Sequence, residues 1–303
     1  MTVRHRKKEI DTSKLRPYGA TKRICGCYYG DECEIAIVSG MPEGIGKSGY
    51  VHHVLADTYG YVSCRDKELL KVMWLKREQQ IKAPKWPLDW ETTKTFIRYL
   101  PEEVVELCKN MLLKGVREPV FHWDDAGSWL NAMDYHDPFV IAFMKYLSLA
   151  RSNWGMVILS TPVEEWVLKK LRTAKGMLRV TINKPRGASS MRSIWRPRIA
   201  RAYRMTRYVG NPRTYWPRQW VDHFIAIVPD DFYKWYKPMR DKYALLMAME
   251  MEQALKKRKA RGWPIERDIE ALDSIKKHID RSHDELKDFE EVITLAAQGE
   301  LPD

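Results

Sequence analysis

The stretch from Ile35 to Tyr50, which reads IAIVSGMPEGIGKSGY, constrains the fold of this chain more than any other. Its apolar start, Ile35 to Val38, predicts a short buried strand, and residues 47–59 predict a helix. The loop between them holds three glycines and a proline. Glycines let successive N–H groups point at one anion, and a helix N-terminus adds partial positive charge. The stretch therefore predicts an α/β fold with a phosphate-binding loop.

The end of this loop, Gly46-Lys47-Ser48, resembles the Walker A motif of P-loop NTPases. The resemblance implies that Lys47 reaches the β- and γ-phosphates of ATP and that the Ser48 hydroxyl holds Mg²⁺. The nucleotide-binding residues implied are Gly44, Ile45, Gly46, Lys47, Ser48 and Gly49. One position departs from the motif, because Met41 stands at the first glycine position and Gly40 lies one residue early. The alternative is a Gly-rich βα turn that binds no nucleotide.

A second motif, VFHWDDAG, runs from Val120 to Gly127 and resembles Walker B. The chemistry requires an acid at the carboxyl end of a strand beside the loop, where Mg²⁺ and water lie. By this resemblance Asp124 orders the Mg²⁺ and its waters, and Asp125 polarises the attacking water. Relatives usually carry Glu where Asp125 stands, so the strength of hydrolysis is open. The alternative is a strand that ends in an Asp-rich turn.

A third strand is predicted at Met156 to Leu159, and Ser160 and Thr161 follow it. Their position resembles sensor 1, which contacts the γ-phosphate or the attacking water. The same residues also fit a Ser/Thr N-cap before an acidic first turn. The order of the three motifs resembles the additional-strand (ASCE) P-loop ATPases, which include AAA+ and RecA/FtsK/HerA-like motors. The guanine signature N-K-x-D is absent, which favours adenine.

Positive charge is concentrated in one window of the chain. The net charge is +12, yet residues 169–218 contain fifteen Lys or Arg and no Asp or Glu, so the remainder is net acidic. Aromatic residues lie among these cations, and this combination predicts contact with DNA or RNA, through phosphate neutralisation and base stacking. The candidate contacts are Arg186, Arg192, Arg196, Arg198, Arg201, Arg204 and Arg207.

Two alternatives remain for the arginines of this protein. They could pair with its acidic remainder, or serve the ATP of a neighbouring subunit, as arginine fingers do in oligomeric ATPases of the class it resembles. Arg151 and Arg172, which flank the sensor strand, are the finger candidates.

Other segments carry weaker signals. Residues 61–64 predict a second strand, and residues 101–114 predict a helix that Gly115 ends. Residues 232–261 predict a long helix, and residues 264–298 predict another with apolar residues at helical spacing. No apolar run approaches the length of a membrane span, and no secretory signal is visible. Five cysteines without framework spacing favour the reducing cytoplasm, and the spacing of Cys25, Cys27 and Cys33 does not favour a zinc site.

The sequence thus predicts an α/β fold: a P-loop NTPase core with a parallel central sheet flanked by helices, plus a C-terminal helical region. We expect a basic arm (residues 1–33), the ATPase core (34–185), a basic segment that completes the sheet (186–228) and the helical region (229–303). The expected function is Mg²⁺-dependent ATP hydrolysis coupled to DNA, in a homo-oligomer. Alternatives are an ATP-gated DNA-binding switch without turnover and a small-molecule kinase. The Lys, Arg, Glu, Trp and Tyr content is similar to that of proteins from archaeal thermophiles, their viruses or plasmids.

Overall fold

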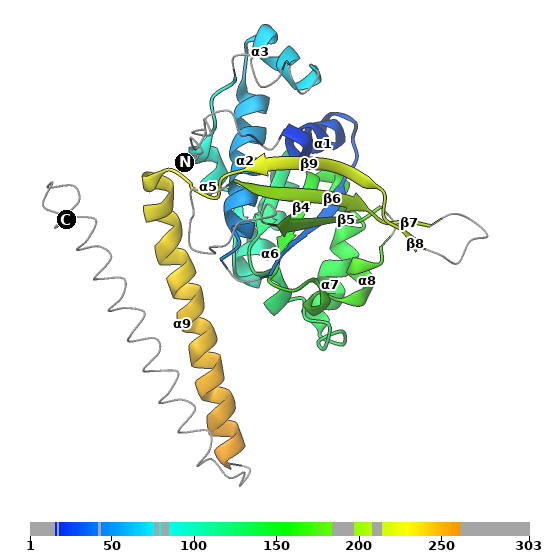
Figure 1. The fold of residues 1–303 in the computed structure, drawn as a ribbon. Helices are drawn as coiled ribbons and strands as arrows, with labels where there is room; N and C mark the ends of the chain where they lie inside the picture. Colours follow the sequence, from blue (N-terminus) through cyan, green and yellow to red (C-terminus); the bar gives the residue numbers. More distant parts are fainter. Residues whose placement is uncertain are drawn as a thin grey trace, which may run out of the picture. The chain divides into compact units, whose positions relative to one another are not determined.

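The computed structural model describes residues 16, 18–41, 44–75, 79, 85–174, 176–183, 197–207 and 214–260. The chain divides into two compact units, residues 1–240 and 241–303, and each is described by itself. A seven-stranded sheet with helices around it forms the first unit (Figure 1). The expected α/β class is therefore confirmed.

The central sheet is mixed and mostly parallel. Its strands follow the order β2-β3-β4-β1-β5-β6-β9. Five neighbouring strands from β2 to β5 pair in parallel, and β6 and β9 add two antiparallel strands at one edge. The strands are β1 (Glu34–Ser39), β2 (Ile97–Arg98), β3 (Glu118–Trp123), β4 (Trp154–Ser160), β5 (Leu178–Asn183), β6 (Arg198–Arg204) and β9 (Arg218–Phe224). Strand β6 lies in the basic window, and β9 begins at the last residue of that window, Arg218.

Helices cover both faces of the sheet, which explains why β4 is buried along its whole length. On β3, His122 contacts His52 of α2 (Lys47–Ser63), with ring centroids 5.6 Å apart. Its neighbour Trp123 contacts Phe143 of α7 (Pro138–Leu147), with centroids 5.1 Å apart. Successive side chains of a strand point to opposite faces, so α2 and α7 lie on opposite sides of the sheet.

A helix not expected from the sequence, α1 (Tyr18–Tyr29), lies within the range assigned to the basic arm. Its residues Ile24 and Cys27 are fully buried, so this part of the range belongs to the core. Arg117 donates hydrogen bonds to the carbonyls of Cys27 and Tyr28 at 3.2 and 2.7 Å and thereby holds the end of the helix. Residues 1–15 of the expected arm lie outside the described residues.

The strand expected at residues 61–64 is wrong, because α2 continues to Ser63. The apolar residue Tyr61 extends the buried face of that helix and packs on Trp86, with ring centroids 5.0 Å apart. The helix expected at residues 101–114 is confirmed as α6 (Pro101–Lys114), and Gly115 ends it at φ 62°. A left-handed residue after the last turn is a common helix stop, and glycine adopts it without a Cβ penalty.

The remaining elements are short, apart from the long helix near the C-terminus. They are α3 (Lys67–Lys71), η2 (Val72–Trp74), α5 (Trp90–Lys94), η3 (Ala126–Ser128), η4 (Ala150–Ser152), η5 (Glu164–Trp166), α8 (Lys169–Arg172), β7 (Thr206–Arg207), β8 (Thr214–Tyr215) and α9 (Asp230–Ala260). The expected long helix is thus confirmed, and its residues up to Arg240 belong to the first unit. The helix expected at 264–298 lies outside the described residues.

In the second unit, the described residues 241–260 are helical and expose Leu245, Met249 and Met251.

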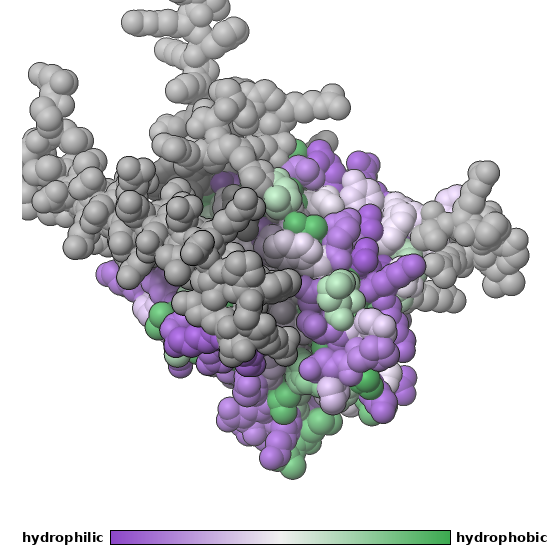
Figure 2. All heavy atoms as spheres, turned by 90° about the horizontal axis from the view of Figure 1, so that it is seen from below, coloured by the Kyte–Doolittle hydropathy of each residue, from purple (hydrophilic) through white to green (hydrophobic). Residues whose placement is uncertain are grey.

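Seen from below, the described surface is mostly hydrophilic, and hydrophobic residues gather in small groups on it (Figure 2). Among the described helices, none combines the length and the apolar composition that crossing a membrane requires.

Candidate functional site

The loop predicted to bind phosphate connects β1 to the N-terminus of α2. Gly44 and Gly46 adopt positive φ angles of 74° and 97°, which side chains with a Cβ rarely tolerate. A Cβ at Gly46 would lie 2.8 Å from the Cβ of Ala226, and one at Gly49 would lie 2.7 Å from the Ala226 carbonyl oxygen. Glycine at positions 46 and 49 thus lets the segment after β9 pack against the start of α2.

Two serine side chains from separate parts of the sequence meet at Asp124, at the carboxyl end of β3. The Ser48 hydroxyl on the first turn of α2 donates to Asp124 Oδ1 at 3.0 Å. The Ser160 hydroxyl at the end of β4 also donates to Oδ1. The sheet brings them together because β4 lies between β1 and β3, in parallel with both. The two Walker-like motifs and the sensor-like serine therefore form one cluster.

Lys47 and Asp125 lie at the border of this cluster. The Lys47 side chain, 9% exposed, donates from Nζ to the carbonyl of Gly40 at 3.3 Å. Asp125 adopts a left-handed conformation with φ 51°, and its N–H donates to Asp124 Oδ1 and to Ser160 Oγ, both at 3.2 Å. This backbone conformation is uncommon for a residue other than glycine and is often found at functional sites.

The structure separates the two sensor candidates. Ser160 contacts Asp124, whereas the Thr161 hydroxyl donates to the carbonyl of Val163 at 3.0 Å. Thr161 is fully buried, and a Cβ at Gly127 would lie 2.3 Å from its Oγ1. We therefore assign Thr161 a structural role and keep Ser160 in the site.

Two histidines lie behind Asp124 and were not predicted as site residues. His122 Nε2 lies 3.1 Å from Ser160 Oγ and 3.6 Å from Asp124 Oδ1. Burial lowers the pKa of His52 to about 3 and also lowers the pKa of His122, so both imidazoles are neutral near pH 7. Burial alone would raise the pKa of Asp124, but the neighbouring imidazoles and the hydrogen bonds from Ser160 and Tyr236 lower it. The result is an ionised carboxylate beside two neutral bases.

The first turns of α9 complete the site, whereas the sequence predicted only a long helix at that position. The Tyr236 hydroxyl donates to Asp124 Oδ2 at 2.9 Å. Arg240 lies one turn further along the helix. Desolvation lowers the pKa of Arg240, but Tyr236 and the carboxylates of Asp124 and Asp125 act in the opposite direction and the net change is upward. The Arg240 cation therefore lies close enough to the two carboxylates for electrostatic interaction with them.

The two arginine finger candidates lie outside this cluster. Arg151 belongs to η4, which precedes β4, and so lies at the opposite end of that strand from Ser160. Arg172 donates from Nε to the carbonyl of Val167 at 2.7 Å, within its own subunit.

Arg198 and Arg204, two of the predicted nucleic-acid contacts, have neighbours within the first unit. Arg198 is 3% exposed, and its Nε lies 3.2 Å from the position a Cβ would take at Gly46. It is therefore a buried cation beside the loop, and burial lowers its pKa. Arg204 forms an ion pair with Glu34.

Among the other predicted contacts, the structure describes the side chain of Arg201. Arg201 is partly exposed on β6. The side chain of Arg207 lies outside what the structure describes, as do residues Arg186, Arg192 and Arg196.

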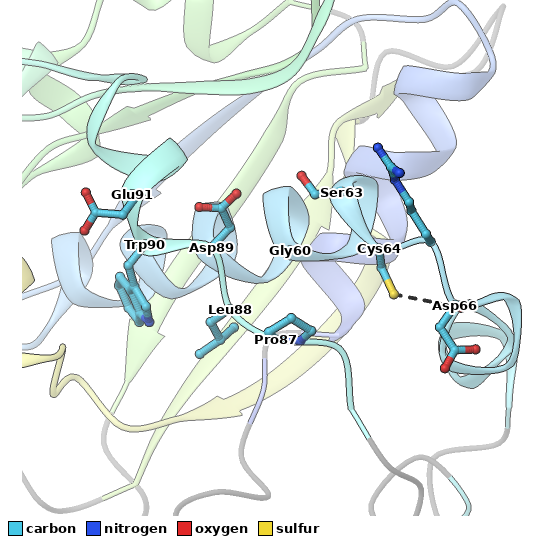
Figure 3. Close-up of a pocket in the computed structure, with 10 residues that line it drawn as sticks. Gly60, Ser63, Cys64, Asp66, Pro87, Leu88, Asp89, Trp90 and Glu91 are labelled. Atoms are coloured by element: carbon cyan, nitrogen blue, oxygen red, sulfur yellow. Dashed lines mark hydrogen bonds between the residues drawn. The ribbon is translucent and has the colours of Figure 1, made fainter.

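A hollow of about 550 Å³ lies at the C-terminal end of α2 (Figure 3). Cys64 and Asp66 form part of its wall, and the Cys64 Sγ donates to the Asp66 carbonyl at 3.8 Å. Gly60 and Ser63 line it, more than three turns after Lys47, which places it roughly 20 Å along the helix from the loop. It is therefore separate from the cluster at Asp124.

Comparison with known proteins gives little beyond the fold. No protein-family model matches the chain, and no curated protein matches it. Among solved structures, the chain is similar to the N-terminal domain of zonular occludens toxin from Neisseria meningitidis, with 12% sequence identity and a TM-score of 0.34. The match covers 67% of this chain and 97% of that domain. The similarity is too weak to carry an argument about function.

Proposed function

We propose that this protein binds ATP with Mg²⁺ at the loop between β1 and α2 and hydrolyses it. The observation that carries the proposal is the meeting of Ser48, Asp124 and Ser160 at one carboxylate oxygen. These residues come from three motifs that resembled the additional-strand ATPases in sequence. In the sheet, β4 lies between the strand of the loop and the strand of the acid, the arrangement to which the name of that class refers.

The residues fit Mg²⁺, which binds through hydroxyl and carboxylate oxygens and retains several waters. Ser48 would supply a direct ligand, and Asp124, held ionised, would order the bound waters. When bound, the ion neutralises charge on the phosphates. The N-terminus of α2 and Lys47 would bind the phosphates themselves, and the buried cation of Arg198 adds positive charge next to Gly46.

For the chemical step, Asp125 is the residue proposed to orient the attacking water. Its backbone is fixed by hydrogen bonds to Asp124 and Ser160, so its carboxyl group projects from a defined position. An arginine from a second subunit of a homo-oligomer would complete the charge stabilisation. DNA is the proposed partner, because fifteen cations without an acid occupy residues 169–218.

A second candidate function is an ATP-gated DNA-binding switch that does not turn over. The observation that favours it is Asp125, which is one methylene shorter than Glu and has a left-handed backbone. If the protein is a switch, Asp125→Asn would leave ATP binding and DNA binding unchanged. If it is an ATPase, the same substitution would abolish ATP hydrolysis and keep ATP binding.

The test measures Mg²⁺-dependent binding of ATP and its turnover, with and without single- or double-stranded DNA. Lys47→Ala should abolish binding, while Lys71→Ala, which removes an exposed lysine paired with Glu68 at 2.5 Å, should leave it unchanged. ATP turnover that DNA stimulates supports the proposed ATPase, and ATP-dependent DNA binding without turnover supports the switch. Absence of ATP binding by the folded wild type would refute both.

A further inference from the structure

His52, His122 and Asp124 present three metal-binding side chains to one point in the interior. One ligand atom from each lies within 4.8 Å of the others, and all three residues are buried. His52 follows Ser48 by four residues on α2, so both occupy the same helix face. His122 precedes Asp124 by two residues at the end of β3, which places them on the same side of the sheet. In the described part of the chain, this is the cluster with metal-ligand geometry.

The histidines of this cluster have polar atoms without a partner. His52 Nε2 and His122 Nδ1 are buried and make no hydrogen bond, although the residues are only 2% and 0% exposed. Buried polar side-chain atoms are normally satisfied, and each exception requires a physical explanation. The ring of His52 packs on Phe232 and Tyr236, with centroids 5.1 and 4.7 Å away, so α9 covers the imidazole with aromatic rings. A cation bound at His52 Nε2 would satisfy that atom.

We propose that His52, His122 and Asp124 bind a first-row transition-metal dication, with Zn²⁺ as the reference ion. Two imidazole nitrogens and one carboxylate oxygen suit Zn²⁺ and similar borderline ions, whereas Mg²⁺ takes oxygen ligands and keeps its waters. The proposal rests on this cluster and not on nucleotide binding, although Asp124 is shared with the proposed Mg²⁺ site. Asp124 would then contact both ions, so the transition-metal ion would fix the position of the carboxylate that serves the proposed Mg²⁺ site.

The geometry requires only small side-chain movement. A tetrahedral ion with bonds of about 2.1 Å holds its ligand atoms roughly 3.4 Å apart. His122 Nε2 and Asp124 Oδ1 are 3.6 Å apart, close to that spacing. Ligand atoms of the cluster within 4.8 Å can reach it by side-chain rotation.

The first experiment uses the full-length wild type, stripped by a chelator under reducing conditions and titrated with Co²⁺ and then Zn²⁺. We expect one equivalent of Co²⁺ with the visible absorption of a tetrahedral site, displaced by Zn²⁺. X-ray absorption of the zinc form should show imidazole and oxygen scattering without sulfur. The sulfur result matters, because the chain contains five cysteines that offer an alternative site.

Single variants locate the site. His52→Asn and His122→Asn should each weaken metal binding by at least about 100-fold, since even changes outside the ligand set cost 10–100-fold. His136→Asn, which removes an exposed histidine, should bind like the wild type. Lys47→Ala should lose ATP and keep the metal, so failure of the nucleotide proposal and failure of this one give different results.

Three outcomes overturn the proposal: a folded wild type that binds neither metal, binding dominated by sulfur, or binding unchanged in both histidine variants. If the variants do not fold, the X-ray absorption of the wild type decides.

Discussion

The hydrogen bond from Tyr236 to Asp124 should be a measurable source of stability. Tyr236→Phe removes the hydroxyl that donates to Oδ2 at 2.9 Å and keeps the ring, which is 7% exposed and packs on His52. A hydrogen bond to a charged group contributes about 1.5–3 kcal/mol net. Because Asp124 is fully buried and ionised, we expect the free energy of unfolding to fall by about 2 kcal/mol. In a unit of this size, that lowers Tm by roughly 4–8 °C.

The control is Tyr233→Phe, three residues earlier on α9, where the ring is 49% exposed. This variant removes the same hydroxyl from a solvated position and should change stability by less than about 0.5 kcal/mol. Urea unfolding followed by tryptophan fluorescence and a thermal melt give the two measurements. If Tyr236→Phe is as stable as Tyr233→Phe, then Tyr236 does not stabilise the buried carboxylate and our account of the site is wrong.

Two further predictions concern the histidines and the loop. The folded-state pKa of His52 is about 3, below its unfolded value of 6.5, so its contribution to stability is complete above pH 6.5 and is lost as pH falls. When the pH falls from 7 to 5, the free energy of unfolding of the metal-free wild type should decrease by about 2 kcal/mol more than that of His52→Asn, as measured by urea unfolding. Equal decreases would contradict a buried neutral imidazole. Asp222, whose pKa burial raises to about 6, acts in the opposite direction in both proteins and cancels in the comparison. Gly46→Ala should lower the free energy of unfolding by about 3 kcal/mol, because of strain at φ 97° and the contact with Ala226. Gly44→Ala, at φ 74° with open space around it, should lower it by about 1 kcal/mol. A Gly46→Ala variant as stable as Gly44→Ala would show that the segment after β9 does not press on the loop.

Local patterns identified the central parts of the site because their chemistry depends on short segments. The strand, glycine loop and helix around Lys47 appear in the structure where the sequence placed them, with α2 beginning at Lys47. Asp124 follows its strand as expected, and the strand expected to end before Ser160 extends to include it. Strand and turn propensities act over a few residues, so these elements could be read without tertiary information.

Errors arose where tertiary packing decides the outcome. Tyr61 and Val62 are β-compatible, yet they remain in α2 because Tyr61 packs on Trp86 from a loop more than twenty residues away. Arg198 has the same chemistry as a surface cation, but its register on β6 places it in the interior beside Gly46. Composition predicts charge, and only the pairing of strands decides whether that charge faces solvent.

The sequence by itself determined the α/β class, the glycine loop at the start of a helix and the acids at the end of a strand. Only the tertiary structure decided that Ser160, and not Thr161, contacts Asp124, and that His52, His122 and Tyr236 surround the same carboxylate. These contacts join residues up to 112 positions apart, and they exist because the strand order places β4 between β1 and β3 while α9 returns to the site. Local propensity carries no information about such distant pairs, because their energy is gained only after the whole sheet has assembled.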